Sequence, residues 1–351
     1  MRQICGMSKT GNLKEAIASV TKPELLLLMS TKERFAQHVA ELEEAFPGVP
    51  SIGCVGMSYS DRQTNENGVS VIAMTDGVKA VANVIEELSV KPMQYIQRLE
   101  EDLQRVSAES RNTVCFDFCC GSDGRLVTTL NTALASRRIS LIGGTGDCNM
   151  VSANGRVYED ACVYLVIKNL RGKITTCKEN IYRLTDQRFV ATKTDPAQRL
   201  LIEIDGKPAV QAYREALGIS EKDVATQTFV NPLGRSYGSE IYLISIQEVC
   251  GKALKCYKQV NNMDFISIME QDDYREVLQE TIRKIRSELP HVSAILSVNC
   301  MFRYLFFQDK NYWEEYLSTM QGCGTHAGLV GFGEHYNKQH VNQTMCCVAF
   351  E

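Results

Sequence analysis

Side chains that form directional hydrogen bonds gather close to the end of the chain. They lie between two segments with the small or alternating apolar residues of strands, 327–332 and 345–350. The polar or flexible members of this stretch are Gly333, Glu334, Asn342, Gln343 and Thr344. A polar loop between strands is a place where a rigid scaffold presents groups to a ligand. The alternative is a hairpin in which Asn342 and Thr344 cap nearby backbone groups.

Charged residues elsewhere in the sequence would complement such a polar loop. Arg303 carries a planar fork of donors that fits a carboxylate, whereas Asp147 and Glu334 could receive an ammonium group. Together these groups suit an anionic or zwitterionic small molecule. A second interpretation stays open, in which Arg303 forms an ion pair with Asp147 or Glu334 that locks two halves of the protein together.

A different chemistry is indicated by Cys119 and Arg125, which are separated by five residues. In cysteine phosphatases this spacing lets loop amides and the arginine cradle phosphate while the thiolate attacks. Leu126 follows the arginine where a hydroxyl residue is usual, and Phe118 precedes the cysteine where a histidine would lower the thiol pKa. Cysteine-dependent phosphatase activity is therefore kept as an alternative to ligand sensing, and we expect a protein that is not an enzyme.

Three of the five histidines, His326, His335 and His340, belong to the last segment and could ligate haem or a metal. A single histidine in a polar loop is more often hydrogen-bonded than ligated. We therefore expect no cofactor and no metal, with a haem-based gas sensor as the alternative. His38 and His291 are expected at the surface.

Composition excludes several classes of protein. The 351 residues carry 38 basic and 42 acidic side chains, a formal charge of -4, and no basic stripe, so nucleic acid is not an expected partner. No apolar run has membrane-spanning length, and the first residues lack the apolar core of a secretion signal. The fourteen cysteines contain no Cys-x-x-Cys pair and fall mostly in apolar strands. Reduced thiols in the cytoplasm are the expected state.

The first half of the sequence alternates between strand and helix patterns. Continuous or alternating apolar residues predict strands at 24–29, 51–55, 69–74, 113–119 and 139–142. Apolar residues at helical spacing predict helices at 31–46, 77–88, 92–106 and 126–136. Antiparallel strands are expected at 156–167 and 174–184, so the sheet should be mixed.

A second part begins near Gly206, where Pro208 introduces a helix that Gly218 ends. Strands are predicted at 227–230, 241–246, 265–269 and 292–299, and helices at 272–289 and 312–320. The expected architecture is α/β, with two closely packed halves, each a mixed β-sheet covered by helices. The halves are predicted to comprise residues 1–207 and 208–351.

Several segments, taken in order, resemble the FIST family of sensory proteins, with its N-terminal and C-terminal parts. They are Ile52-Gly53-Cys54, Gly143-Gly144-Thr145-Gly146-Asp147, Gly206-Lys207-Pro208-Ala209, Asn231-Pro232-Leu233, Cys300-Met301-Phe302-Arg303, Gly333-Glu334 and Asn342-Gln343-Thr344. The resemblance extends over residues 24–350. This sequence departs from the family pattern after Cys54, where Val55-Gly56-Met57-Ser58 follows. It also departs at Val341, because many relatives carry a histidine just before Asn-Gln-Thr and His340 is one residue early.

The resemblance implies a signal-input module that senses a small ligand, such as an amino acid or a small carboxylate. Its implied ligand-binding residues are Cys54, Gly144, Asp147, Arg303, Gly333, Glu334, Asn342, Gln343 and Thr344. Output would pass to a separate partner, such as a histidine kinase, a chemoreceptor or a cyclic-di-nucleotide signalling protein. Some members of the family bind haem, and in this sequence His340 lies one residue before the position of the histidine that many relatives carry.

Overall fold

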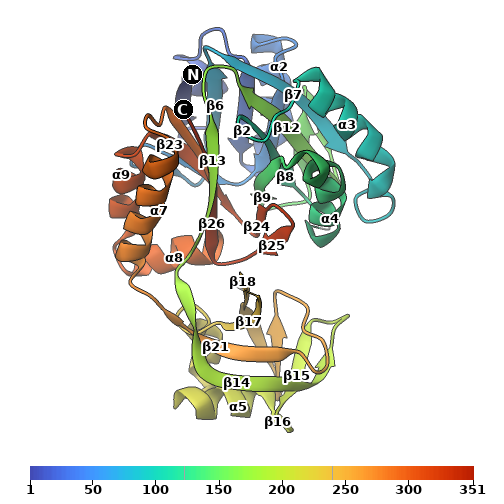
Figure 1. Ribbon diagram of the computed structural model, residues 1–351, viewed down its shortest axis with the longest axis vertical. Coiled ribbons are helices and arrows are strands. Elements are labelled where there is room, and N and C mark those ends of the chain that lie inside the picture. The colour runs from blue at the N-terminus through green and yellow to red at the C-terminus, as the bar shows by residue number, and fades with distance from the viewer. Residues whose placement is uncertain (122, 239) are drawn as a thin grey trace. The chain divides into compact units, whose positions relative to one another are not determined.

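The computed structural model describes residues 1–121, 123–238 and 240–351. These residues form two compact units. The first unit comprises residues 1–179, 278–340 and 344–351, and the second comprises residues 180–277 and 341–343. Both units contain helices and β-strands (Figure 1), which confirms the α/β class. The division at residue 207 stays a prediction.

The first unit contains three six-stranded sheets. Sheet A has the order β1 (Arg2–Ser8), β6 (Val69–Thr75), β2 (Leu25–Ser30), β3 (Ser51–Val55), β10 (Val151–Ala153) and β11 (Arg156–Tyr158). Sheet C has the order β25 (Gln339–Val341), β24 (Glu334–Tyr336), β9 (Ser140–Thr145), β8 (Thr113–Cys119), β12 (Cys162–Asn169) and β7 (Val78–Ile85). Sheet B has the order β13 (Ile174–Asn180), β26 (Thr344–Phe350), β22 (Ala294–Cys300), β23 (Thr325–Gly331), β4 (Met57–Ser60) and β5 (Gln63–Asn65).

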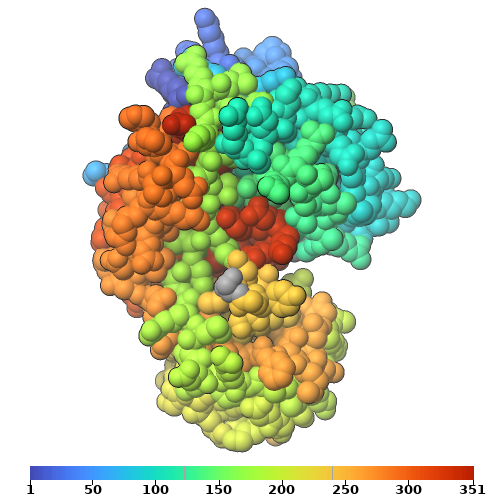
Figure 2. Space-filling view, viewed as in Figure 1, coloured from blue at the N-terminus to red at the C-terminus, as the bar shows by residue number. Residues whose placement is uncertain are grey.

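Each of these sheets mixes parallel and antiparallel pairing, as the sequence predicts. The parallel neighbours are β2 with β3, β8 with β9, and β22 with β23. Sheet B combines strands from distant parts of the sequence, because β4 and β13 flank the C-terminal strands. On the face shown in Figure 2, red C-terminal residues form only a small patch, in keeping with the complete burial of β26.

Helices cover the sheets of the first unit through their apolar faces. Leucines of α3 (Ile96–Arg105) and α4 (Asp123–Leu134) join the core with side chains of β8, β9 and β12. Residues of α1 (Leu13–Ile17) and α2 (Phe35–Ala45) pack on β2 and β6. Sheet B contacts α8 (Met301–Asp309) and α9 (Trp313–Gln321). The remaining long helix is α7 (Tyr274–Glu288), and short 3-10 turns are η1 (Lys32–Arg34), η2 (Pro92–Tyr95) and η3 (Ala135–Arg137).

The second unit is built around one antiparallel sheet. Its order is β18 (Glu240–Ile244), β17 (Leu233–Tyr237), β21 (Phe265–Gln271), β14 (Tyr182–Asp195), β15 (Leu200–Ile204), β20 (Ala253–Cys256) and β19 (Ile246–Cys250), with β16 (Lys207–Pro208) beside β15. The helical segments are α5 (Ala209–Leu217), η4 (Glu221–Asp223) and α6 (Val224–Gln227). Apolar residues of α5 and the sheet form one core, which includes Ala209, Tyr213, Leu233 and Ile268.

Three local predictions are wrong. Residues 77–88 are not helical, since their core is β7, which pairs along its whole length with β12. Residues 227–230 begin at the end of α6 rather than forming a strand. His38 is fully buried, because its Nδ1 bonds the Ser30 hydroxyl at 2.6 Å and its Nε2 contacts the Gly11 carbonyl at 2.9 Å. Among the described residues, no helix is long and apolar enough to cross a membrane.

Candidate functional site

The carboxyl ends of several strands in the first unit meet at one place. The Asp147 amide donates to the Val55 carbonyl at 2.8 Å, which joins the segment after β9 to the end of β3. The Gly146 amide donates to the Cys119 carbonyl of β8 at 3.0 Å, and the Phe332 amide donates to the Thr145 carbonyl at 2.9 Å. Ligands of open α/β sheets bind outside the carboxyl ends of parallel strands. The same location is therefore a candidate binding site here.

Charged and polar side chains surround this junction, and we call Lys32, Cys54, Asp147 and Cys148 the strand-end site. Lys32 follows β2 in η1 and is exposed, as is Asp147, while Cys54 is buried and Cys148 is half-buried. Among the described residues, neither Lys32 nor Asp147 forms an ion pair. The strand-end site thus presents an exposed cation and an exposed anion, neither of which is in an ion pair among the described residues.

The Cys148 thiol lies within electrostatic range of Lys32, Asp147 and Glu33. Its pKa is raised above the ordinary value, chiefly by burial. The Lys32 ammonium opposes this shift, whereas the carboxylates of Asp147 and Glu33 add to it. Burial also raises the pKa of Cys54 well above its usual range, so both thiols are protonated at neutral pH.

A second group of predicted residues lies where β24 pairs with β9. Glu334 is directly opposite Gly144, and the Gly333 carbonyl accepts from the Thr145 amide at 2.9 Å. The Glu334 carboxylate is fully buried and accepts from both the amide and the hydroxyl of Thr344, at 3.1 and 2.7 Å. Thr344 therefore bonds a buried carboxylate through its hydroxyl, and not a backbone group as in the hairpin interpretation.

An ion pair between Asp117 and His335, not anticipated from the sequence, is buried in the same sheet. The carboxylate Oδ2 lies 2.8 Å from His335 Nδ1, and both side chains are fully enclosed. Burial raises the pKa of Asp117, and the neighbouring His335 opposes that shift. Gly143 lies between them in the sheet, and a Cβ at this position would be 2.0 Å from Asp117 Oδ1. The absence of a side chain at Gly143 is what lets the pair form.

Arg303 is held in the interior of the first unit by an ion pair with Glu179. The pair joins Arg303 Nη2 to Glu179 Oε1, and neither side chain has any exposed surface. Burial lowers the pKa of Arg303, but the carboxylate outweighs this and raises it above the ordinary value. The rings of Phe307 and Tyr316 lie 4.5 and 5.4 Å from the guanidinium carbon. Asp147 and Glu334, proposed above as partners of Arg303, are not its partners.

A chain of buried hydrogen bonds extends from Arg303 across sheet B. Arg303 Nε donates to Asn299 Oδ1 at 3.1 Å, and Asn299 Nδ2 donates to the Tyr59 hydroxyl at 2.8 Å. Tyr59 contacts the Ser297 hydroxyl at 2.7 Å, which in turn contacts His326 Nε2 at 2.6 Å. Tyr59 reaches Ser297 across Gly328, where a Cβ would be 2.5 Å from the tyrosine hydroxyl.

The other predicted residues of the C-terminal signature belong to the second unit. Gln343 Nε2 donates to the Ser245 hydroxyl at 2.7 Å and to the Thr228 carbonyl at 3.2 Å, and the side chain is fully buried. Asn342 is also buried. The structure therefore distributes the predicted ligand-binding residues among several places, and it brings Cys54 and Asp147 together at the strand-end site.

The cysteine of the phosphatase alternative and two histidines of the haem alternative are buried. Cys119 is fully buried and Arg125 is exposed, while Ser122 of the loop between them lies outside the described residues. His326 and His335 are fully enclosed and bonded to Ser297 and Asp117, so neither presents a ring to a haem plane. His340 packs against Gly333, where a Cβ would be 2.4 Å from its Nε2. These histidines do not fit a haem site.

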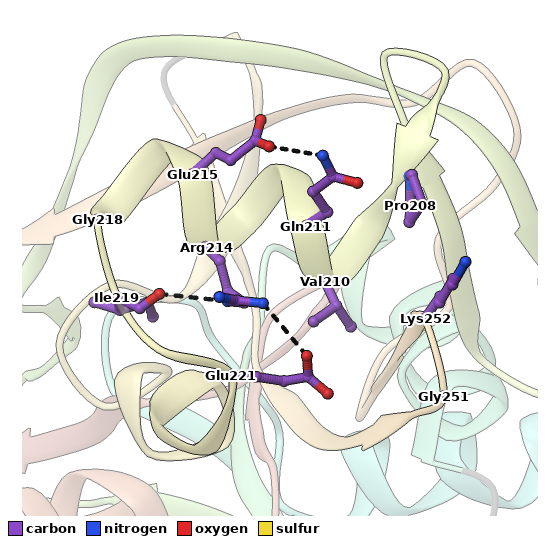
Figure 3. A pocket seen from close by; sticks show the side chains of 10 residues that line it. All are labelled: Pro208, Val210, Gln211, Arg214, Glu215, Gly218, Ile219, Glu221, Gly251 and Lys252. Carbon is purple, nitrogen blue, oxygen red and sulfur yellow. Dashed lines mark hydrogen bonds and ion pairs between the residues drawn. The ribbon is translucent and has the colours of Figure 1, made fainter.

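An open pocket of about 630 Å³ lies on the second unit, between α5, the residues after it and the β19–β20 turn (Figure 3). Arg214 crosses its floor and bonds the Ile219 carbonyl at 3.4 Å and the Glu221 carboxylate at 3.3 Å. Gln211 bonds Glu215 at 2.7 Å along the helix. Most charges here neutralise one another at the surface, and none of the predicted ligand-binding residues lines the pocket.

Two protein-family models match consecutive parts of this chain. The FIST N domain matches residues 24–207, and the FIST C domain matches residues 209–337. The chain belongs to the FIST family, whose domains are sensory domains of signal transduction. Among curated proteins, no match to the chain was found.

Gly143→Ala is expected to destabilise the protein by about 3 kcal/mol or more, because the new Cβ collides with Asp117 and separates a buried ion pair. Urea unfolding followed by circular dichroism measures the change. Gly124→Ala is the matched control, since a Cβ there meets nothing within 4 Å. Equal stability of the two variants would contradict the proposed role of Gly143.

Arg303→Met is expected to lower the free energy of unfolding by about 3–5 kcal/mol, because it leaves Glu179 buried without its cation. The double variant Glu179→Leu with Arg303→Met should cost less than the sum of the single changes. Arg183→Met removes an exposed ion pair with Glu270 and should cost at most about 1 kcal/mol. If the double variant lost as much free energy of unfolding as the two single variants together, Glu179 and Arg303 would not stabilise each other.

The free energy of unfolding should decrease as the pH is lowered, because His326 is buried in its neutral form. Burial lowers the pKa of His326 to about 3 from an ordinary value of 6.5. The unfolded chain therefore binds a proton here below about pH 6.5, whereas the folded chain does not until about pH 3. Folding stability is lost across that window, at up to about 1.4 kcal/mol per pH unit.

His326→Gln removes this titration and should flatten the dependence of unfolding free energy on pH between about pH 6 and pH 4. Urea unfolding at a series of pH values measures the slope. His291→Gln, at an exposed position, should leave the slope of the wild type unchanged. A slope in His326→Gln as steep as that of the wild type would assign the pH dependence to other groups.

Proposed function

We propose that this FIST protein binds a small zwitterionic or anionic metabolite, either an amino acid or a small carboxylate, at the strand-end site. The observation that carries the proposal is that the exposed Lys32 and Asp147 both act electrostatically on Cys148, where the carboxyl ends of β3, β8 and β9 are joined by hydrogen bonds. A ligand with a carboxylate and an ammonium group would satisfy both charges.

The chemistry of the site supports a compact ligand. The Lys32 ammonium donates three hydrogen bonds and would hold a carboxylate, while the Asp147 carboxylate only accepts and would hold an ammonium group. Cys54 and Cys148 are protonated, weakly polar groups that add no charge to the strand-end site. Arg303 is reserved for Glu179 in the interior, which favours Lys32 over Arg303 as the carboxylate contact.

Ligand binding at this position offers a route for a signal. Several strands end at the site, and a ligand that bridges Lys32 and Asp147 would hold the ends of β2 and β9 together. We propose that the resulting change passes to a separate output partner, such as a histidine kinase, a chemoreceptor or a cyclic-di-nucleotide signalling protein. The fourteen cysteines form no disulfide, which fits action in the reducing cytoplasm.

Isothermal titration of the reduced protein with amino acids and small carboxylates tests the proposal. One member of this panel should bind, and Lys32→Gln and Asp147→Asn should each weaken binding about tenfold or more, because each removes a charged hydrogen bond. Lys252→Gln is the matched control, since it removes an exposed lysine from the pocket of the second unit.

Two outcomes would overturn the proposal. In the first, a ligand binds with unchanged affinity to Lys32→Gln and Asp147→Asn but loses affinity in Lys252→Gln. In the second, no member of the panel binds while a phosphate ester is hydrolysed by the wild type and not by Cys119→Ser. The second outcome would restore the phosphatase alternative.

A further inference from the structure

Two cysteines face each other on neighbouring strands of sheet B. Cys177 belongs to β13 and Cys347 to β26, which are adjacent in the sheet. The Glu351 amide donates to the Lys173 carbonyl at 3.1 Å where these strands meet. Cys347 lies four residues before Glu351, and Cys177 lies four residues after Lys173. In an antiparallel pair, the two cysteines are therefore directly opposite one another.

The two sulfur atoms are in contact in this arrangement. A hydrogen bond with Cys347 lowers the pKa of the Cys177 thiol below its ordinary value. Burial opposes this shift, Lys284 adds to it, and the carboxylates of Glu288 and Glu179 oppose it. The same contact raises the pKa of Cys347 well above the usual range. Cys177 is thus the more acidic thiol of the pair, and Cys347 holds its proton.

The backbone geometry of the pair is compatible with a covalent bond. The Glu351-to-Lys173 hydrogen bond marks a hydrogen-bonded pair of residues, and such pairs recur at every second position along an antiparallel ladder. Opposed residues of this type have Cα atoms about 5.5 Å apart, within the range of about 4.4–6.8 Å found for disulfides. Both side chains project from the same face of the sheet, because they are directly opposed.

We propose that Cys177 and Cys347 are a redox modification site that forms a reversible intramolecular disulfide on exposure to hydrogen peroxide. The Cys177 thiolate attacks the peroxide, so that an S–O bond forms, the O–O bond breaks and hydroxide leaves as water after protonation. Cys347, deprotonated as it attacks, then displaces a second hydroxide from the sulfenic acid and forms the S–S bond. Two thiols and one peroxide yield one disulfide and two waters.

The position of Cys177 in the sheet explains how an oxidant reaches a buried thiol. Its strand, β13, is the edge strand of sheet B, so only one side of it is paired within the sheet. Local opening of an edge strand costs less than opening the interior of a sheet. Cys347, by contrast, lies on β26 between two other strands and has no exposed surface.

Oxidation at this site would act on the buried hydrogen-bond chain. Cys347 is directly opposite Ser297, which bonds Tyr59 and His326. Glu179, the partner of Arg303, is two residues from Cys177 on the same face of β13. A disulfide would fix β13 to β26 beside these groups. We therefore expect the oxidised protein to resist unfolding more than the reduced protein does.

The test is treatment of the full wild-type chain with a slight excess of hydrogen peroxide, followed by peptide mapping under non-reducing conditions. We expect a linked peptide pair that contains Cys177 and Cys347, is two hydrogens lighter than the sum of its parts, and separates on addition of dithiothreitol. The melting temperature should rise by several degrees on oxidation and return on reduction.

Variants distinguish this site from other thiols and do not depend on the proposed ligand. Cys347→Ser and Cys177→Ser should each abolish the linked peptide and the temperature shift, and Cys177→Ala replaces Cys177→Ser if the serine variant does not fold. Cys323→Ser is the matched control, because this partly exposed thiol is electrostatically coupled to Cys177 and should be dispensable. A link between Cys177 and Cys323, or oxidation confined to the exposed Cys250, would overturn the proposal.

Discussion

A guanidinium that is removed from water must keep a carboxylate beside it, and the interior of the first unit is arranged around this requirement. Arg303 on α8 is paired with Glu179 on β13, and its remaining contacts are Asn299 and two aromatic rings. The helix, the edge strand and β22 are thus fixed relative to one another by one charge pair. Because either partner alone would be a buried, uncompensated charge, the pair is costly to separate.

Small residues make the remaining polar contacts of this interior possible. Asp117 reaches His335 across Gly143, and Tyr59 reaches Ser297 across Gly328. In both cases a glycine on the middle strand leaves room for side chains of the two outer strands to meet. Arg303 is paired with Glu179 and Asp117 with His335 in the interior, whereas Lys32 and Asp147 at the strand-end site are exposed and form no ion pair among the described residues. This division of roles separates the groups that stabilise the fold from the groups available to a ligand.

Most helices and many of the buried strands follow from apolar periodicity, but the pairing of the strands does not. Leu25–Ser30 and Tyr274–Glu288 are evident from the pattern of apolar residues in the sequence. Val78–Ile85 resembles a helix because its short apolar residues fit both periods, and pairing with Cys162–Asn169 decides the outcome. The ion pairs of Glu179 and Asp117 join residues 124 and 218 positions apart. The sequence offered one indication of such buried polar contacts, which was a single polar residue within an apolar strand, as at Asp117 or Asn299. The sequence did not indicate Lys32 as a site residue. Lys32 and Asp147 come within range of the same thiol, Cys148, only because the ends of β2, β3 and β9 meet in the fold.

The most direct test of the central claim is a crystal structure of the reduced protein with the bound amino or carboxylic acid. The proposed mode of binding predicts that the ligand lies at the strand-end site, with its carboxylate on Lys32 and its ammonium group on Asp147. It also predicts that the ion pair of Arg303 and Glu179 stays intact. A ligand that lies in the pocket beside Arg214 and Lys252, or one that displaces Glu179 from Arg303, would contradict it.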